Sequence, residues 1–515
     1  MLVISKSRFL SVFRSLKHPI RDFLPKAMRK LSSKGRQLFV GYLYKSNNLH
    51  IHNLATRIIW IYRRFKTSGI TIKKIDVQSV EVDVKPEIPC LSWLGELQND
   101  EWHFICGNKV EFNDSNIIEG AWDGNFDEWN FKNSEFVFGS GVSIANGELR
   151  FIPPRHCAES LYVIHKKKES KLYVSNSICF LIEKANIDIG SSDFNSIKNG
   201  LENSIESATK EGCDFANPVI SETENIVFYR MTYYNFSVNS DFSIRQHFLP
   251  TKKYFETFTQ YREFLISKTR AICENANSLS RKNAFSPITS ISRGYDSPAA
   301  AVVASELGYL DAITIGVEVW NMDDCGETIG NKLGMNTEVV SHVMADEIAD
   351  LNVDFDKEIK NISLEFIATA GAGDDVTFYP FREYLDQKIF LSGVYGDFVW
   401  EKDAPLTPGL PKRGIFGKSI TEFRLNTGYF HLPIPALGAR FSAPLMSLSN
   451  SREMQSFSVG GSYDRPIPRR LIEEAGIPRE EFGVEKCATA PHILNRKELF
   501  DEAIAETRKR YVSTR

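Results

Sequence analysis

The chain has 515 residues, of which 42% are apolar and 25% are charged. This composition is that of an average globular protein, and it excludes a wholly disordered or fibrous chain. The sequence has no apolar run of about 18 residues, so we expect no membrane-spanning helix. The eight cysteines are scattered without a C-x-x-C pair, which indicates reduced thiols in a cytoplasmic protein.

Positive charge is concentrated at the start of the chain. Residues 1–74 hold 17 Lys or Arg and one acid, Asp22, so their balance is +16 and that of the remainder is -19. Two stretches, 8–17 and 54–65, also place apolar residues at helical spacing. We therefore predict a basic amphipathic extension over residues 1–90 on an acidic globular body.

Two roles for this extension stay open. Its helices either pack on the body with their basic faces in water, or bind an anionic membrane surface or an acidic protein. The second role would place the protein peripherally at the inner face of the membrane. A third interpretation, placed after these two, is an organelle transit peptide. No base-reading chemistry is evident, so we expect no specific nucleic acid.

Residues 91–250 have the residue pattern of a β-sheet domain. Short runs rich in Phe, Tyr, Val and Ile alternate with polar residues, as in 102–105, 136–138, 161–164 and 226–229. Turn residues separate them, and Asn146-Gly147 predicts a tight hairpin. A helix is expected near 192–210.

Residues 251–515 begin with a helical apolar stripe and continue with strands and helices in alternation. The expected strands are 285–291, 312–317, 338–341 and 388–391, and the expected helices are 298–307, 327–333 and 381–385. This alternation predicts an α/β doubly wound parallel sheet, with ligands at the carboxyl ends of its strands.

The first of these strands leads into a loop with the chemistry of an anion site. It reads Ser292-Arg293-Gly294-Tyr295-Asp296-Ser297, and Pro298 follows at a favoured first helical position with Ser297 as the expected N-cap. Backbone N–H groups and hydroxyls at a helix N-terminus favour a bound anion. An ordinary capped turn would look similar.

A second loop of this kind follows strand 388–391. It reads Ser392-Gly393-Val394-Tyr395-Gly396-Asp397. Both loops would lie at the same edge of a parallel sheet, so Asp296 and Asp397 could face each other across a phosphate chain. Two carboxylates with phosphate oxygens form a hard-ligand Mg²⁺ site. A turn carboxylate bonded to its own backbone is the alternative for Asp397.

These residues carry a resemblance to the asparagine synthetase family. Residues 292–297 resemble its pyrophosphate loop, S-G-G-x-D-S, and 392–397 resemble its second loop, S-G-x-G-x-D-E. Residues 135–182 resemble the end of its amino-terminal glutaminase domain, and 226–248 resemble the following linker strands. Late segments also match in order, namely 440–445, Arg469-Arg470 and Glu485-Lys486.

The resemblance implies a fold and an activity. It implies a degenerate glutaminase-like (Ntn) β-sandwich over 91–250 and an ATP-binding synthetase-like domain over 251–515. The implied reaction adenylates a substrate carboxylate with ATP and Mg²⁺, releases pyrophosphate, and transfers the acyl group to an amine or ammonia with release of AMP. The carboxylate substrate would be a small molecule or a peptide.

Residue roles are implied in the same way. The pyrophosphate would lie on Ser292, Arg293, Gly294 and Ser297, with Ser392 and Gly393 in the second loop. Asp296 and Asp397 would hold Mg²⁺. Backbone near Ile315-Gly316 would meet the adenine, and Lys486 would stabilise developing charge, with a surface lysine as the equal alternative. Three further acids, Asp323, Asp324 and Asp375, could bind a substrate amine, although solvated surface positions are expected for them.

The chain departs from the family pattern in three places. Leu2 stands where the family has its nucleophilic cysteine, so we expect no glutaminase activity. Arg293 replaces a glycine of the first loop, and Phe398 replaces the glutamate of the second. Arg293 either adds a cation to the phosphate site or blocks it, and blockage would make the chain a non-catalytic nucleotide-binding or scaffold relative.

Overall fold

The structure is a computed structural model. It describes residues 75, 77–156, 158–188, 190–211, 218–247, 254–316, 318–319, 322–340, 378, 381–403, 421–461 and 463–483. Lys73–Pro405 and Gly409–Arg515 form one compact unit, and Met1–Ile72 with Leu406–Pro408 form another. The amphipathic stretches expected at 8–17 and 54–65 lie outside the described residues, and all that follows concerns the first unit.

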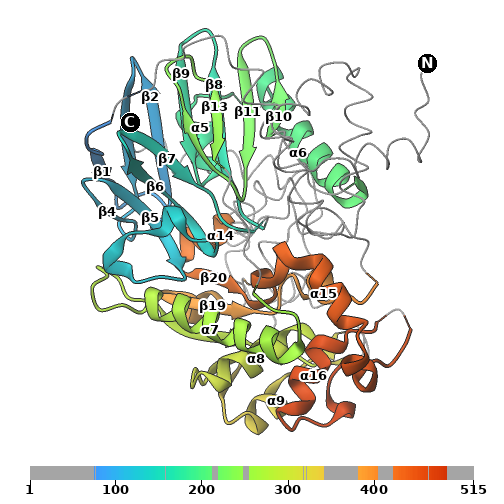
Figure 1. Cartoon of the computed structure of the whole chain (residues 1–515). Helices are drawn as coiled ribbons and strands as arrows, with labels where there is room; N and C mark the ends of the chain where they lie inside the picture. The colour runs from blue at the N-terminus through green and yellow to red at the C-terminus, as the bar shows by residue number, and fades with distance from the viewer. Residues whose placement is uncertain are drawn as a thin grey trace, which may run out of the picture. The chain divides into compact units, whose positions relative to one another are not determined.

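A seven-stranded sheet opens the described part of the chain (Figure 1). Its strands, in spatial order, are β1 (Val82–Val84), β3 (Glu101–Cys106), β2 (Trp93–Gln98), β9 (Lys171–Ser175), β8 (Leu161–Lys166), β11 (Ile226–Met231) and β10 (Val219–Glu222). Neighbouring strands are antiparallel except for the parallel pair β1–β3. Asn99 and Asp100, both at positive φ, form the two-residue turn between β2 and β3.

A six-stranded antiparallel sheet packs against the first. Its order is β13 (Ile244–His247), β12 (Asn235–Val238), β7 (Glu148–Ile152), β6 (Val137–Ala145), β5 (Asn116–Trp122) and β4 (Glu111–Asn113). The predicted hairpin is confirmed, because Asn146 and Gly147 turn between β6 and β7 with φ of 55° and 68°. Short 3-10 turns, η1 (Phe126–Glu128) and η2 (Phe131–Asn133), precede β6.

The inner faces of the two sheets share one core. Inward-facing side chains from both sheets are fully buried together, among them Trp93, Phe104, Ile117, Val142, Phe151 and Phe236. A second cluster lies on the other face of the seven-stranded sheet, where α5 (Ile178–Lys184) and α6 (Ser192–Glu211) cover Leu94 and Tyr162. The strands predicted over residues 91–250 and the helix predicted near 192–210 are thus confirmed. The strands form two packed sheets, and the helices cover the outer face of one of them.

The second half contains a five-stranded sheet in which every described pairing is parallel. The order is β18 (Asn336–Val340), β15 (Asp311–Ile315), β14 (Ser286–Ser290), β19 (Lys388–Ser392) and β20 (Phe430–Pro433). Four of these strands match the predicted ones to within a few residues. Strand β20 was not predicted, because its four residues carry no periodicity that distinguishes a strand.

Helices accompany this sheet. They are α7 (Phe258–Ala276), α8 (Asp296–Glu306), α9 (Glu327–Lys332), α12 (Arg382–Leu385), α13 (Gly396–Val399), α14 (Thr421–Thr427), α15 (Ser442–Ser449) and α16 (Pro466–Glu474). The same half of the chain also contains shorter segments. They are the strand pair β16 (Glu318–Val319) and β17 (Met322–Asp323), and the 3-10 turns η4 (Ile434–Phe441), η5 (Arg452–Phe457) and η6 (Arg479–Glu481). Within the described ranges, no helix is long and apolar enough to cross a membrane.

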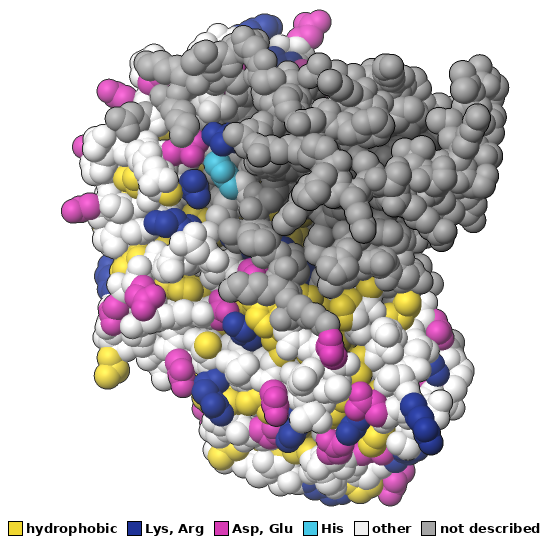
Figure 2. All heavy atoms as spheres, viewed as in Figure 1, with side chains coloured by type: hydrophobic (Ala, Val, Ile, Leu, Met, Phe, Trp, Pro, Cys, Tyr) yellow, Lys and Arg dark blue, Asp and Glu magenta, His cyan; other side chains and the backbone are white. Residues whose placement is uncertain are grey.

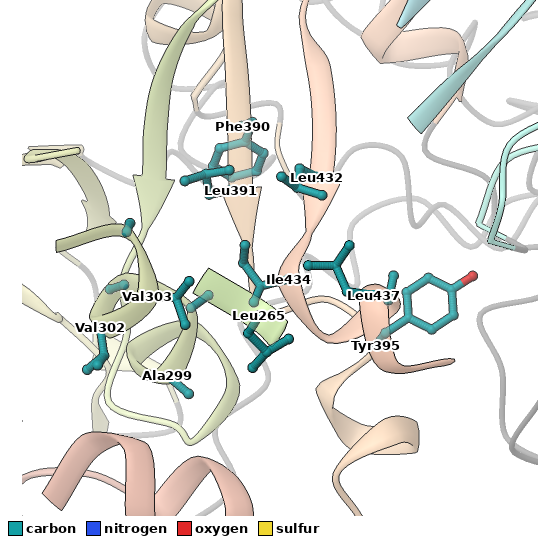
Figure 3. Close-up of a cluster of buried hydrophobic side chains, with 14 of the residues drawn as sticks. Leu265, Ala299, Val302, Val303, Phe390, Leu391, Tyr395, Leu432, Ile434 and Leu437 are labelled. Atoms are coloured by element: carbon teal, nitrogen blue, oxygen red, sulfur yellow. The ribbon is translucent and has the colours of Figure 1, made fainter. Parts of the chain in front are cut away.

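Apolar side chains from strands and helices meet beneath the sheet (Figure 3). Leu265 of α7, Val303 of α8, Phe390 of β19 and Leu432 of β20 belong to this cluster, and all four side chains are buried. Helix α8 is apolar on every side from Pro298 to Ala304, and each of these residues is buried. A helix of this composition belongs in a core, and it fixes the loop that precedes it.

A buried ion cluster connects the first two sheets to the second half. Arg424 of α14 donates from Nη1 to Glu119 of β5 at 2.7 Å and from Nε to Glu159, and all three side chains are at most 2% exposed. Glu119 also accepts from Ser140 at 2.7 Å. Arginine inserted between two carboxylates therefore joins segments far apart in the chain.

Candidate functional site at the carboxyl edge of the parallel sheet

The first loop runs from the end of β14 to the start of α8. The Ser292 and Ser297 hydroxyl oxygens lie 2.7 Å apart, and the Gly294 N–H donates to Ser292 Oγ at 3.3 Å. The expectation that Ser297 caps the helix is wrong, because the helix begins at Asp296 and Tyr295 already has helical dihedral angles. Freed from capping, the Ser297 hydroxyl pairs with Ser292 at the sheet edge.

Neighbouring segments hold this loop at its base. The Arg293 N–H donates to Asp324 Oδ1 at 3.0 Å, and the Gly483 N–H donates to the Arg293 carbonyl at 2.7 Å. Asp324 is 5% exposed, so the solvated position expected for it is wrong. Its role in the structure is to position the loop. The side chain of Asp323 and the whole of Asp375 lie outside the described residues.

The second loop leaves β19 at Ser392. The Ser392 hydroxyl is hydrogen-bonded to His431 Nε2 at 2.6 Å and accepts from the Val394 N–H at 3.3 Å. Tyr395 then takes a left-handed conformation with φ of 78° and directs the chain into α13. Loss of the left-handed turn would misdirect the backbone that carries Asp397.

Two glycines let the second loop touch the first. A Cβ on Gly393 would lie 2.3 Å from the Ser297 nitrogen, and one on Gly396 would lie 2.1 Å from Asp296 Cγ. Neither distance is compatible with a side chain. Strands β14 and β19 are parallel neighbours, so the structure brings the two predicted loops together at one edge.

The carboxylates of both loops converge on one guanidinium. Arg465 Nη1 donates to Asp296 Oδ2 at 2.5 Å, and Arg465 Nη2 donates to Asp397 Oδ1. The Arg465 side chain is 6% exposed, and its guanidinium carbon lies 4.8 Å from the Tyr463 ring centroid. Although burial opposes the charge, the two carboxylates raise the pKa of Arg465 above its ordinary value, so it stays protonated.

Arg465 is the site residue that the sequence analysis missed. It lies 169 positions from Asp296 and directly before α16, in a Gly- and Ser-rich turn whose sequence does not indicate which residues it contacts. The resemblance singled out Arg469-Arg470, four and five residues further on. Arg469 instead bonds the buried Tyr295 hydroxyl, and Arg470 pairs with Glu474 at 2.7 Å.

The other residues predicted for the site are the expected adenine contacts and the late lysine. Ile315 and Gly316 lie at the carboxyl end of β15, the strand next to β14, and the Gly316 N–H donates to the Val340 carbonyl at 3.0 Å. They occupy the same sheet edge as the two loops. Phe398 is partly buried against the main core. Lys486 lies outside the described residues.

The donor set is compatible with a magnesium ion bound together with phosphates. In the described ranges no group of three or more His, Cys, Asp or Glu side chains forms a metal site. Protein Mg²⁺ sites often use one or two carboxylates, with substrate phosphates and water supplying the rest. Asp296 and Asp397 already hold a cation between them, and they would be the two protein ligands.

The cysteines of the first sheet region show no nucleophilic environment. Burial raises the pKa of Cys90 to about 11, and its thiol donates to the Leu425 carbonyl at 3.4 Å. Burial also raises the pKa of Cys106 above its ordinary value. The thiolate is the reactive form of cysteine, so neither residue is prepared to attack a substrate.

A comparison of the chain with protein-family models and with curated proteins finds no match.

Proposed function

We propose that this chain is an ATP-dependent amide-forming ligase of the asparagine synthetase type, with a glutaminase-like sandwich that lacks glutaminase activity. The observation that carries the proposal is the convergence of Asp296 and Asp397, from two separate loops, on one cation at the carboxyl edge of a parallel sheet. Ligands bind at this edge in open α/β sheets. The sequence resemblance names the same two loops.

The residues divide the work of binding ATP. The hydroxyls of Ser292 and Ser297 and the backbone of Gly294 would hold the pyrophosphate, with Ser392 and Gly393 supporting the second loop. Asp296 and Asp397 would hold Mg²⁺, which neutralises phosphate charge when bound. Arg293 and Arg465 would add positive charge on the phosphate oxygens. The backbone of Ile315 and Gly316 would meet the adenine, and Lys486 is proposed to act on the intermediate.

The chemistry needs charge neutralisation more than covalent help. A substrate carboxylate oxygen attacks the α-phosphorus of ATP and the bond to pyrophosphate breaks, which gives an acyl-adenylate. An amine or ammonia then attacks the acyl carbon, AMP leaves with the electrons of its C–O bond, and the nitrogen loses a proton. Pre-aligned donors around the departing pyrophosphate lower the barrier of the first step.

The test compares Asp296, at the start of α8, with an aspartate of the sheet. ATP with Mg²⁺ should raise the melting temperature of the wild-type chain, because a ligand that binds only the native state stabilises it. Asp296→Asn should lose most of that gain. Asp311→Asn changes an exposed aspartate at the start of β15 and should keep it. An equal gain in all three proteins would contradict the site.

Pyrophosphate exchange separates a ligase from a non-catalytic relative. A panel of carboxylic acids, amino acids and peptides should include one that drives exchange of labelled pyrophosphate into ATP. Stabilisation by ATP without exchange for any acid would favour the scaffold alternative. That alternative has an observation of its own, because Arg465 already occupies the carboxylate pair.

We also propose that the basic extension binds an anionic membrane surface or an acidic protein. Its +16 balance over residues 1–74 is the supporting observation. On the face drawn in Figure 2, basic and acidic side chains of the described residues are interspersed rather than gathered by sign. Each Lys or Arg near an anionic bilayer contributes roughly 1 kcal/mol of binding free energy.

Vesicle sedimentation tests this proposal. Full-length protein should sediment with anionic vesicles at low salt, and a version lacking residues 1–74 should not. Equal sedimentation would show an arm packed on the body.

A further inference from the structure

The guanidinium of Arg465 occupies the position that a metal ion would need. It contacts one oxygen of Asp296 and one of Asp397 through two different nitrogens. A divalent ion held between the same two carboxylates would lie close to this guanidinium and compete with it for their negative charge. Two cations cannot share this space, because their like charges repel strongly at such distances.

Arg465 is delivered by a segment with its own anchors. Asp464 accepts hydrogen bonds from the backbone N–H groups of Val459 and Gly460, each at 3.1 Å, and contacts Lys402 at 3.3 Å. Helix α16 begins at the next residue, Pro466. The backbone on both sides of Arg465 is therefore fixed, and the side chain is the part that can exchange partners.

The exposure of the three partners differs in a way that permits exchange. The Arg465 side chain is 6% exposed, while Asp296 is 20% and Asp397 is 40% exposed. Both carboxylates are thus more open to solvent than the guanidinium between them. A ligand with negative charge can thus approach the pair only if it brings positive charge or draws the guanidinium toward itself.

We propose that Arg465 is a built-in counter-ion that excludes free Mg²⁺ from the Asp296–Asp397 pair, so that the metal enters only together with a nucleoside triphosphate. The phosphate oxygens take over the guanidinium, and the carboxylates are released to the metal that accompanies them. This inference rests on the proposed function, whose nucleotide it uses. It adds an order of events, in which the metal without nucleotide is not bound.

The experiment uses Mn²⁺ as a paramagnetic probe and the full-length chain at constant ionic strength. Electron paramagnetic resonance measures the free Mn²⁺ without nucleotide. The wild-type chain should bind weakly, and Arg465→Gln should bind at least tenfold more tightly. Arg465→Lys, which keeps the charge, should stay close to wild type. The matched control is Arg470→Gln, which removes an arginine of α16 that pairs with Glu453 and Glu474, and it should change nothing.

A second variant locates the new site. Adding Asp397→Asn to Arg465→Gln should return Mn²⁺ binding to the weak wild-type level. With a non-hydrolysable ATP analogue present, the wild-type chain should gain affinity for Mn²⁺ by tenfold or more, and Arg465→Gln should gain less. Circular dichroism and the melting temperature confirm that each variant is folded.

Two results would overturn the proposal. One is an Mn²⁺ affinity of Arg465→Gln within twofold of wild type, and the other is a gain that persists in the double variant. Either can occur while the analogue still binds and raises the melting temperature, which leaves the ligase proposal intact. If the wild-type chain binds no analogue, the ligase proposal fails, and entry of metal with nucleotide fails with it. Tighter Mn²⁺ binding by Arg465→Gln would then support only the exclusion of the free ion.

Discussion

Arg424 and Arg465 are each held between two carboxylates, and the two ion clusters differ most in how deeply they are buried. Arg424 lies between Glu119 and Glu159, and none of these side chains is more than 2% exposed. Arg465 lies between Asp296 and Asp397, of which the second is 40% exposed. The same combination of charges is thus buried in one of these clusters and open to solvent in the other.

Burial makes one of these ion clusters structural, and exposure allows the other to exchange ligands. Around Arg424 the partners are bonded further, as where Trp93 donates to Ser140 at 3.1 Å and Ser140 donates to Glu119. Buried ions without partners are very costly, so this cluster can only stay closed. At the sheet edge, water or phosphate can replace either partner of the Arg465 cluster. Burial, and not the residue types, separates a structural connection from a candidate binding site.

The largest effect is expected from opening the buried cluster. Arg424→Met leaves Glu119 and Glu159 without their cation and should lower the free energy of unfolding by about 3–5 kcal/mol. Arg465→Gln should lower it by about 1 kcal/mol or less, because its partners remain hydrated. Urea unfolding of both variants measures the contrast. Equal losses would show that exposure does not separate the two clusters.

Part of this comparison could be predicted from the sequence, and part could not. The loops at 292–297 and 392–397 follow buried apolar strands, and local patterns of this kind are visible in the chain. The arginines are not, because Arg465 lies 169 residues from Asp296, and Arg424 lies 305 residues from Glu119. Tertiary packing selects one arginine among many, and residue type alone gives no indication of which.

Local signals also failed where packing overruled them. Ser297 before Pro298 is a favoured N-cap, yet the helix begins at Asp296 because Tyr295 is buried in a helical conformation. Asp324 looks like a surface acid, yet it is buried under the first loop and accepts the Arg293 N–H. In both cases the deciding contact joins distant segments, because Arg469 of α16 bonds the Tyr295 hydroxyl and Asp324 bonds a loop 31 residues before it.

A third buried carboxylate shows what happens without an arginine. Glu422 precedes Arg424 by two residues, and it accepts hydrogen bonds from Ser177 at 2.9 Å and from the Cys179 N–H at 3.4 Å. Burial raises its pKa from 4.5 to about 7, and these hydrogen bonds only partly oppose the shift. Glu119 and Glu159 are buried beside an arginine, whereas Glu422 is buried beside hydrogen-bond donors. A comparison of these carboxylates therefore separates the effect of burial from that of a cation.

The sign of its pH dependence follows from this shift. Between pH 4.5 and 7 the folded chain holds a proton on Glu422 that the unfolded chain has released. The free energy of unfolding therefore falls as the pH rises through this window, by about 3 kcal/mol in total at about 1.4 kcal/mol per unit of pKa. Urea unfolding at pH 5 and pH 8 should show this fall in wild type. In Glu422→Gln, which cannot ionise, the fall should be smaller by about that amount. Parallel profiles of the two proteins would contradict the buried, protonated state.

A steric change at Gly396 tests the exposed cluster without altering a charge. A Cβ on Gly396 would lie 2.1 Å from Asp296 Cγ and 2.2 Å from Asp296 Oδ1, so we expect Gly396→Ala to displace the Asp296 carboxylate. Overpacking of this kind costs about 1–3 kcal/mol, and we expect about 2 kcal/mol in urea unfolding. The variant should also lose most of the thermal stabilisation by ATP with Mg²⁺, although no charge has changed.

Gly294→Ala provides the matched control in the first loop. A Cβ there would meet its nearest atoms, Ser292 Oγ and the Tyr463 hydroxyl, at 3.6 and 3.7 Å, which are ordinary contacts. Its effect on unfolding should stay within about 0.5 kcal/mol. If Gly396→Ala behaves like Gly294→Ala in both measurements, close packing of the second loop does not hold Asp296 in place. The carboxylate would then owe its position to Arg465 alone, and the exposed cluster would depend on its arginine as completely as the buried one does.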